Sequence, residues 1–258
     1  MNKRYVLRQL SSQVSVVGLL VITALAGGDA AAQFGPPPVP QGDARDVAPI
    51  DLTGQWVSVI TEDWRFRMVT PPKNDYPGIP LNAAARAEAD SWDPAAVEAA
   101  GESCKAYGAG GIMRMPTRLR IDWDNANALQ IETDAGRQTR TLQFEEVPDE
   151  APSWQGNSVA EWEFHLAGFG QPPANGNLKV VTDGMRAGFF RKNGVPYSEN
   201  AVLTEYFDRF TQHDGSEWLV VVSVLDDPTY YTTPIITSTN FRRQDDRSGW
   251  NPTDCSAY

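Results

Sequence analysis

Residues 201–225, AVLTEYFDRFTQHDGSEWLVVVSVL, predict a β-hairpin made of two long strands. Asp214-Gly215 is a tight-turn pair, because Gly adopts the positive φ that short hairpin turns require. The second strand is apolar on both faces, with Trp218, Val220, Val222 and Val224 alternating against Leu219, Val221 and Leu225. A strand of this kind suits a barrel wall that other elements partly cover.

The rest of the chain after Pro116 also reads as strands. Alternating patterns predict a three-strand meander at 119–123, 129–132 and 140–144, and later strands at 158–166, 178–183 and 234–243. Many antiparallel strands in one chain leave exposed edges unless the sheet closes. The sequence therefore predicts a mainly β fold, an antiparallel barrel of about eight to nine strands. A β-sandwich, which leaves a similar pattern, is the alternative.

A helical insert interrupts the first strands. Residues 52–69 predict a strand pair or one long bent strand, and the prolines that follow end it. Asn82 suits the N-cap of a helix over 83–91, and Asp93-Pro94 predicts a second helix that Gly101 ends. The insert at 70–111 is expected to act either as a lid over the barrel mouth or as a structural cap.

The N-terminal residues predict export. Residues 1–32 have a basic start, a short apolar stretch and an Ala-rich end, which is the order of a signal peptide. We therefore expect an exported protein, periplasmic or extracellular, that keeps no membrane span. Removing these residues changes the net charge from −11 to −13, because three basic residues and one acidic residue are lost. Residues 33–50 predict a Pro-rich flexible leader, and residues 51–258 a single barrel domain.

The cysteine count agrees with export. Cys104 and Cys255 are the only two, and an oxidising compartment favours a disulfide between them. On the chain-entropy model, a bridge across such a loop stabilises the fold by about 5 kcal/mol. Two unpaired buried thiols are the alternative.

Composition and motifs narrow the function classes. The chain is 41% hydrophobic and 21% charged, which is ordinary for a globular domain and excludes a disordered chain or a multi-span membrane protein. Its acidic balance argues against nucleic acid as a partner. No phosphate-binding, dinucleotide-binding or metalloprotease motif is present, and two His residues cannot supply a three-His metal site. We therefore expect no cofactor and no metal.

Two resemblances add to this. The segment Leu52-Thr53-Gly54-Gln55-Trp56 resembles the Gly-x-Trp motif of lipocalins, in which an Arg of the last strand covers the Trp; Arg242 or Arg243 would take that part. Segments 63–65, 112–114, 192–198 and 204–210 resemble a group of exported bacterial proteins of hypothetical function. The resemblance implies a lipocalin-like (calycin-like) barrel with a cavity for a small apolar molecule.

Charged residues inside strands are the candidate site. If they point into the cavity, a carboxylate beside Tyr or Arg can transfer protons. The candidates for catalysis are Glu132, Glu205, Tyr197 and Arg140, and those for ligand binding are Trp64, Arg114, Tyr206 and Arg191. The alternative is that these charges lie outward and pair across the sheet. His165 with Glu163 is a weaker candidate for a general base.

Three functions remain open. The first is an exported protein that binds a small hydrophobic or aromatic molecule inside the barrel. The second is a cofactor-independent lyase, isomerase or hydrolase acting on such a molecule. The third is a structural, envelope-associated module with no site. The direction in which Glu132, Arg140, Glu205 and Tyr197 point distinguishes them. Convergence on open volume favours the enzyme, apolar volume alone favours the binder, and a filled interior favours the structural module.

Overall fold

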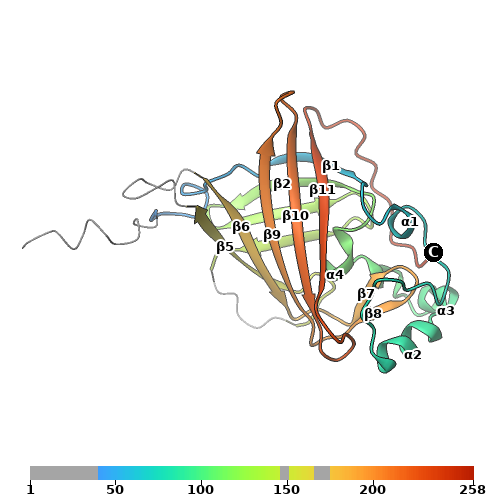
Figure 1. Ribbon diagram of the computed structural model, residues 1–258. Coiled ribbons are helices and arrows are strands. Elements are labelled where there is room, and N and C mark those ends of the chain that lie inside the picture. Colours follow the sequence, from blue (N-terminus) through green and yellow to red (C-terminus); the bar gives the residue numbers. More distant parts are fainter. Residues whose placement is uncertain (1–39, 146–150, 166–174) are drawn as a thin grey trace, which may run out of the picture. The chain divides into compact units, whose positions relative to one another are not determined.

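The chain folds as a closed barrel of nine strands. The computed structural model describes residues 40–145, 151–165 and 175–258 (Figure 1). The barrel strands are β1 (Gly54–Val59), β2 (Arg118–Asn125), β3 (Ala128–Thr133), β4 (Thr139–Gln143), β5 (Asn157–His165), β6 (Asn175–Asp183), β9 (Val202–Thr211), β10 (Glu217–Asp226) and β11 (Ile235–Gln244). This confirms the predicted mainly β barrel. The hairpin predicted over residues 201–225 is formed by β9 and β10.

The strand order is β1-β11-β10-β9-β6-β5-β4-β3-β2, and pairing of β1 with β2 closes the sheet. One pair departs from the predicted antiparallel pattern. β4 and β5 run parallel and pair at only two positions, Leu142 with Ser158 and Gln143 with Val159. Parallel neighbours cannot be joined by a tight hairpin, which is why a longer connection follows β4.

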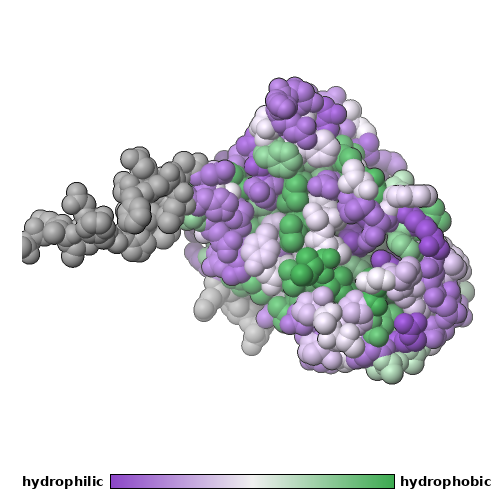
Figure 2. Space-filling view, viewed as in Figure 1, coloured by the Kyte–Doolittle hydropathy of each residue, from purple (hydrophilic) through white to green (hydrophobic). Residues whose placement is uncertain are grey.

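β10 faces the core with one side only. Its inward residues Leu219, Val221 and Leu225 are buried, whereas the outward Val220, Val222 and Val224 are half-buried. Figure 2 shows hydrophobic atoms at the centre of the face that β9, β10 and β11 form. The outer face of β10 is therefore partly covered, which agrees with the prediction from its two apolar faces.

The insert gathers at one end of the barrel, together with a small hairpin (Figure 1). Its elements are α1 (Trp64–Arg67), α2 (Ala83–Ser91), α3 (Pro94–Ala99), the 3₁₀ turn η1 (Ser103–Ala106) and α4 (Ala109–Ile112); the hairpin is β7 (Gly188–Arg191) with β8 (Val195–Tyr197). The predicted caps are confirmed, since Asn82 accepts from the Ala85 amide and Asp93 from the Ala95 amide.

The chain departs from the predicted strand over 52–69. β1 ends at Val59, and Asp63 takes a left-handed conformation with φ 51° immediately before α1. A left-handed residue reverses the chain direction locally, which an extended strand cannot tolerate.

α4 closes the barrel at the insert end. Ile112 and Met113 are buried within the same core cluster as Leu119, Phe207 and Phe241 of the barrel. Gly110 is required here, because a Cβ would stand 2.8 Å from the Tyr197 ring. This dense packing is what the structural-cap alternative for the insert leads one to expect.

The Gly-x-Trp segment makes the contact that its resemblance implies. Trp56 is buried, and the Arg243 guanidinium lies 5.7 Å from its ring centroid, whereas Arg242 faces outward. Gly54 has φ 121°, and a Cβ there would stand 3.2 Å from Arg243 Nε. Glycine is therefore needed for the arginine to lie across this strand.

The leader meets the barrel earlier than predicted. The Ala44 amide donates to Asn127 Oδ1 at 2.8 Å, and Trp162 Nε1 donates to the Ala44 carbonyl at 2.8 Å. The leader therefore packs on the barrel at Ala44, upstream of the predicted start near Leu52. The predicted signal peptide at 1–32 and the leader residues 33–39 lie outside the described residues.

Cys104 and Cys255 form the predicted disulfide, which joins η1 to the C-terminal segment. A disulfide is compatible with export, since such bonds persist in oxidising compartments. Of the helices in the described part of the chain, none is both long enough and apolar enough to cross a membrane.

Candidate functional site

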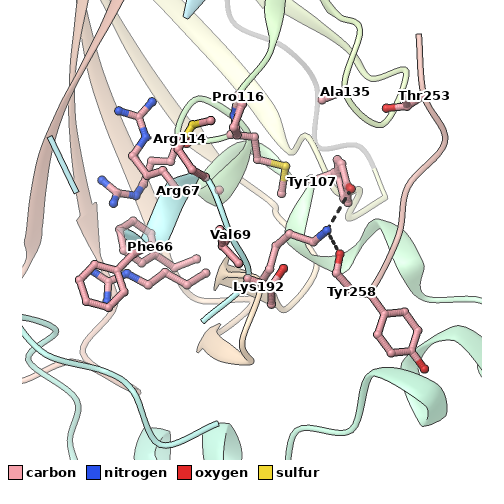
Figure 3. A pocket seen from close by; sticks show the side chains of 16 residues that line it. Phe66, Arg67, Val69, Tyr107, Arg114, Pro116, Ala135, Lys192, Thr253 and Tyr258 are labelled. Atoms are coloured by element: carbon pink, nitrogen blue, oxygen red, sulfur yellow. Dashed lines mark hydrogen bonds between the residues drawn. The ribbon is translucent and has the colours of Figure 1, made fainter. Parts of the chain in front are cut away.

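A crevice of about 340 Å³ lies outside the barrel at its insert end (Figure 3). Most of its lining comes from four segments that are distant in the sequence: residues 66–70 at the end of α1, residues 107–116 with α4, residues 190–192 at the end of β7, and the C-terminal Thr253 and Tyr258. Ala135 completes the lining. In Figure 3, Arg67, Arg114 and Phe66 lie on one side of it and Lys192, Tyr107 and Tyr258 on the other.

Two buried arginines on one wall share a single carboxylate oxygen. The side chains of Arg114 and Arg191 are 8% and 5% exposed. Arg114 Nη2 lies 2.8 Å from Asp63 Oδ2, and Arg191 Nη2 lies 3.7 Å from the same atom. A third arginine, Arg67, pairs with Glu62 and donates from Nε to the Arg114 carbonyl at 2.7 Å.

Aromatic rings hold the two guanidinium groups in place. Arg114 lies over Phe190 with its guanidinium carbon 4.9 Å from the ring centroid, and Arg191 lies over Phe66 at 4.4 Å. Guanidinium groups stack favourably on aromatic faces, and the stacking leaves the N–H edges free to bind anions. The wall therefore presents oriented donors on an apolar support.

This wall carries positive charge that its own carboxylates only partly satisfy. Burial, and then the charge of Arg114, lower the pKa of Arg191 to about 10, so its guanidinium is still charged at neutral pH. Burial also lowers the pKa of Arg67. Within the described structure, Arg191 Nε and Arg67 Nη2 are buried and have no hydrogen-bond partner. Buried donors without a partner are costly, and an anion would satisfy them.

The opposite wall is built by the C-terminal segment. Lys192 Nζ donates to the main-chain oxygen of Tyr258 and to the Tyr107 hydroxyl, the latter at 3.5 Å. The Ser256 amide donates to the same hydroxyl at 3.3 Å. The disulfide anchors this segment to η1, next to Tyr107.

The predicted ligand-binding residues divide into two pairs. Arg114 and Arg191 both line the crevice and share Asp63. Trp64 is 66% exposed on α1 and is not part of the crevice lining. Tyr206 is also not part of it, because it faces outward from β9, opposite Val222 and Lys179. Alternation along β9 places Glu205 inside and therefore Tyr206 outside.

The predicted catalytic residues do not form one site. Glu205 and Arg140 make a buried ion pair at 2.6 Å inside the barrel, where Arg140 also donates to Ser158 Oγ at 3.1 Å and to Thr182 Oγ1 at 2.6 Å. Glu132 faces outward on β3, opposite Arg120. Tyr197, the last residue of β8, is buried in a second cluster, next to α4. These four side chains therefore do not converge on one site.

Side chains fill the interior where the resemblance implies a cavity. Buried residues of all barrel walls form one core cluster. A hollow between α4 and the inner faces of β9, β10 and β11 measures about 10 Å³, which is room for one water at most. The crevice at the barrel end is thus the better-formed candidate site.

Sequence reasoning missed several members of this crevice. Phe66, Arg67, Phe190 and Lys192 line it, and Asp63 contacts its arginines. A signal was present in the alternation of Arg with aromatic residues at 63–67 and in Phe190-Arg191-Lys192. His165 is exposed at the end of β5 and bonds to Asn177, away from the crevice.

Fold and site together define a closed β-barrel whose insert end carries an arginine-lined crevice. Comparison of the chain with protein-family models, with curated proteins and with solved structures finds no match. Across residues 40–145, 151–165 and 175–258, no three His, Cys, Asp or Glu side chains gather as metal ligands.

Proposed function

We propose that this protein binds a small organic anion with an aromatic part in the crevice at the barrel end. The observation that carries the proposal is the arginine pair, Arg114 and Arg191, which is buried, stacked on rings and joined only by the partly exposed Asp63. Arginine forks match planar anions, and a crevice of about 340 Å³ is within the usual range of small-ligand sites.

The proposal keeps the predicted small-molecule partner but changes its chemistry. A purely hydrophobic ligand would leave the crevice cations unpaired, at a cost in desolvation. An anion with an aromatic ring would bind both the donors and the rings of Phe66 and Phe190. The enzyme alternative depended on four side chains that lie apart. The filled barrel interior favours the structural module over a ligand inside the barrel, so the binding proposal rests on the crevice outside it. The disulfide and the N-terminal pattern support binding outside the cytoplasm.

Binding to benzoate tests this proposal. Isothermal titration calorimetry compares benzoate with benzyl alcohol, its neutral analogue. We expect Arg191→Gln to weaken benzoate binding at least tenfold, because a charge-assisted hydrogen bond contributes about 1.5–3 kcal/mol. Arg247→Gln is the matched control, since Arg247 is exposed and pairs with Asp122 away from the crevice. Equal binding of benzyl alcohol, or unchanged binding in Arg191→Gln, would contradict the proposal.

A further inference from the structure

We propose that the ligand's anionic group is a carboxylate, and that it competes with Asp63 for the guanidinium groups of Arg114 and Arg191. This inference rests on the proposed function and names the ligand class of the same site. It makes Asp63 an internal competitor that lowers the affinity of the crevice for external carboxylates.

The first support is the way in which Asp63 meets the arginines. One oxygen, Oδ2, faces both guanidinium groups, at 2.8 Å from Arg114 and 3.7 Å from Arg191. The longer contact leaves Arg191 under-satisfied, and its Nε has no partner in the described structure. A free carboxylate is not tied to the backbone, so it can pair with both arginines at full hydrogen-bonding distance.

The second support is that Asp63 is the partner able to move. Its side chain is 43% exposed, whereas both arginines are at least nine-tenths buried and stacked on Phe190 and Phe66. Asp63 precedes a helix of four residues and has the left-handed φ of 51°, and its side chain makes no capping hydrogen bond there. A left-handed conformation is costly for most residues other than Gly. Displacing Asp63 therefore breaks few interactions, while displacing either arginine breaks many.

The third support concerns ligand class. Asp63 shows which anion the arginine pair accommodates, namely a planar group with one negative charge. A phosphate monoester has up to two charges and three oxygens, and it would place excess negative charge beside Glu62, the partner of Arg67. A carboxylate reproduces the charge and shape of the group that it replaces, so we expect selectivity for carboxylates over phosphates.

Removal of the Asp63 side chain tests the proposal. Asp63→Gly keeps a residue that accepts φ 51° and removes the carboxylate. We expect benzoate to bind this variant about tenfold more tightly than wild type, because no internal group competes. We also expect acetate to raise the thermal unfolding midpoint of the variant, whereas acetamide, chloride and phosphate at equal ionic strength do not. Asp63→Asn is the second variant, since Asn also tolerates the left-handed region.

Glu161→Gln is the matched control for charge, because Glu161 is exposed on β5 and pairs with Lys179 on the outer wall. Its benzoate affinity should equal that of wild type. Unchanged or weaker benzoate binding in both Asp63 variants overturns the inference, while weakening by Arg191→Gln still upholds the proposed function. If phosphate raises the thermal unfolding midpoint of the Asp63→Gly variant as much as acetate does, the assignment of the ligand's anionic group as a carboxylate is overturned. Failure of wild type and of both variants to bind benzoate overturns the two proposals together.

Discussion

The molecule contains two buried arginine sites that differ in how their charge is balanced. Inside the barrel, Arg140 and Glu205 are 4% and 1% exposed, and two hydroxyl groups accept hydrogen bonds from the arginine Nε and Nη2. At the crevice, Arg114 and Arg191 are almost as buried, yet their shared carboxylate from Asp63 is 43% exposed.

The difference separates a structural ion pair from a candidate binding site. Arg140 and Glu205 come from opposite walls of the barrel, so folding itself brings the two charges together and shields them from water. At the crevice, one carboxylate serves two guanidinium groups at the edge of the solvent. Buried charge with its own buried partner stabilises one arrangement, whereas buried charge that faces an opening is available to a ligand.

The largest effect is expected from the disulfide, which constrains the crevice and lies outside the barrel. Replacing Cys104 and Cys255 by Ser should lower the free energy of unfolding by about 5 kcal/mol on the chain-entropy model. The C-terminal segment carries Thr253 and Tyr258 of the crevice wall, so benzoate binding should weaken as well. Urea unfolding followed by circular dichroism, with calorimetry for binding, measures both.

Reductant provides the control for this comparison, because it should destabilise wild type and leave the double Ser variant unchanged. If the Ser variant keeps full benzoate affinity, the bridge does not shape the crevice. In that case the crevice, like the interior site of Arg140 and Glu205, would keep its structure without the disulfide.

A slightly smaller effect is expected from Glu205→Gln inside the barrel. This change leaves the Arg140 cation buried without its partner, which costs about 3–5 kcal/mol. Replacing both residues, as Arg140→Met with Glu205→Leu, should recover most of that loss. Benzoate affinity of the folded variants should stay unchanged, because this pair lies away from the crevice. A loss below about 1 kcal/mol in urea unfolding would show that the interior pair is not a structural one.

Much of the barrel follows from the sequence, because strands, turns and caps are local features. Alternation identified β2 through β6 and β9 through β11, and Asn82 and Asp93 marked the helix starts correctly. The parallel pairing of β4 with β5 was beyond this reasoning, since pairing depends on contacts between distant segments. The strands β7 and β8 are short, and a run of three or four residues has too few positions to show a period.

The candidate site was less predictable, because four distant segments assemble it. Arg114, which lies between Met113 and Met115, and Arg191 were predicted as ligand-binding residues, and both line the crevice and face Asp63. Arg140 and Glu205 showed the same local pattern and form a closed pair in the barrel instead. The local residue pattern indicates that a charged side chain is buried. The fold decides which group it pairs with.

The smallest effect is expected from Tyr197→Phe, which separates a packing role from the predicted catalytic one. The Tyr197 hydroxyl is buried without a hydrogen-bond partner in the described structure, so its loss should change stability at pH 7 by about 1 kcal/mol or less, and benzoate binding should not change.

Burial raises the pKa of Tyr197 above its usual 10. Above pH 10 the unfolded chain therefore loses this proton while the folded chain keeps it, and stability falls as pH rises. The variant lacks that contribution, so urea unfolding at pH 8 and at a pH above 10 should show a smaller alkaline loss than wild type. An equal alkaline loss, or weaker benzoate binding, would contradict a role confined to packing.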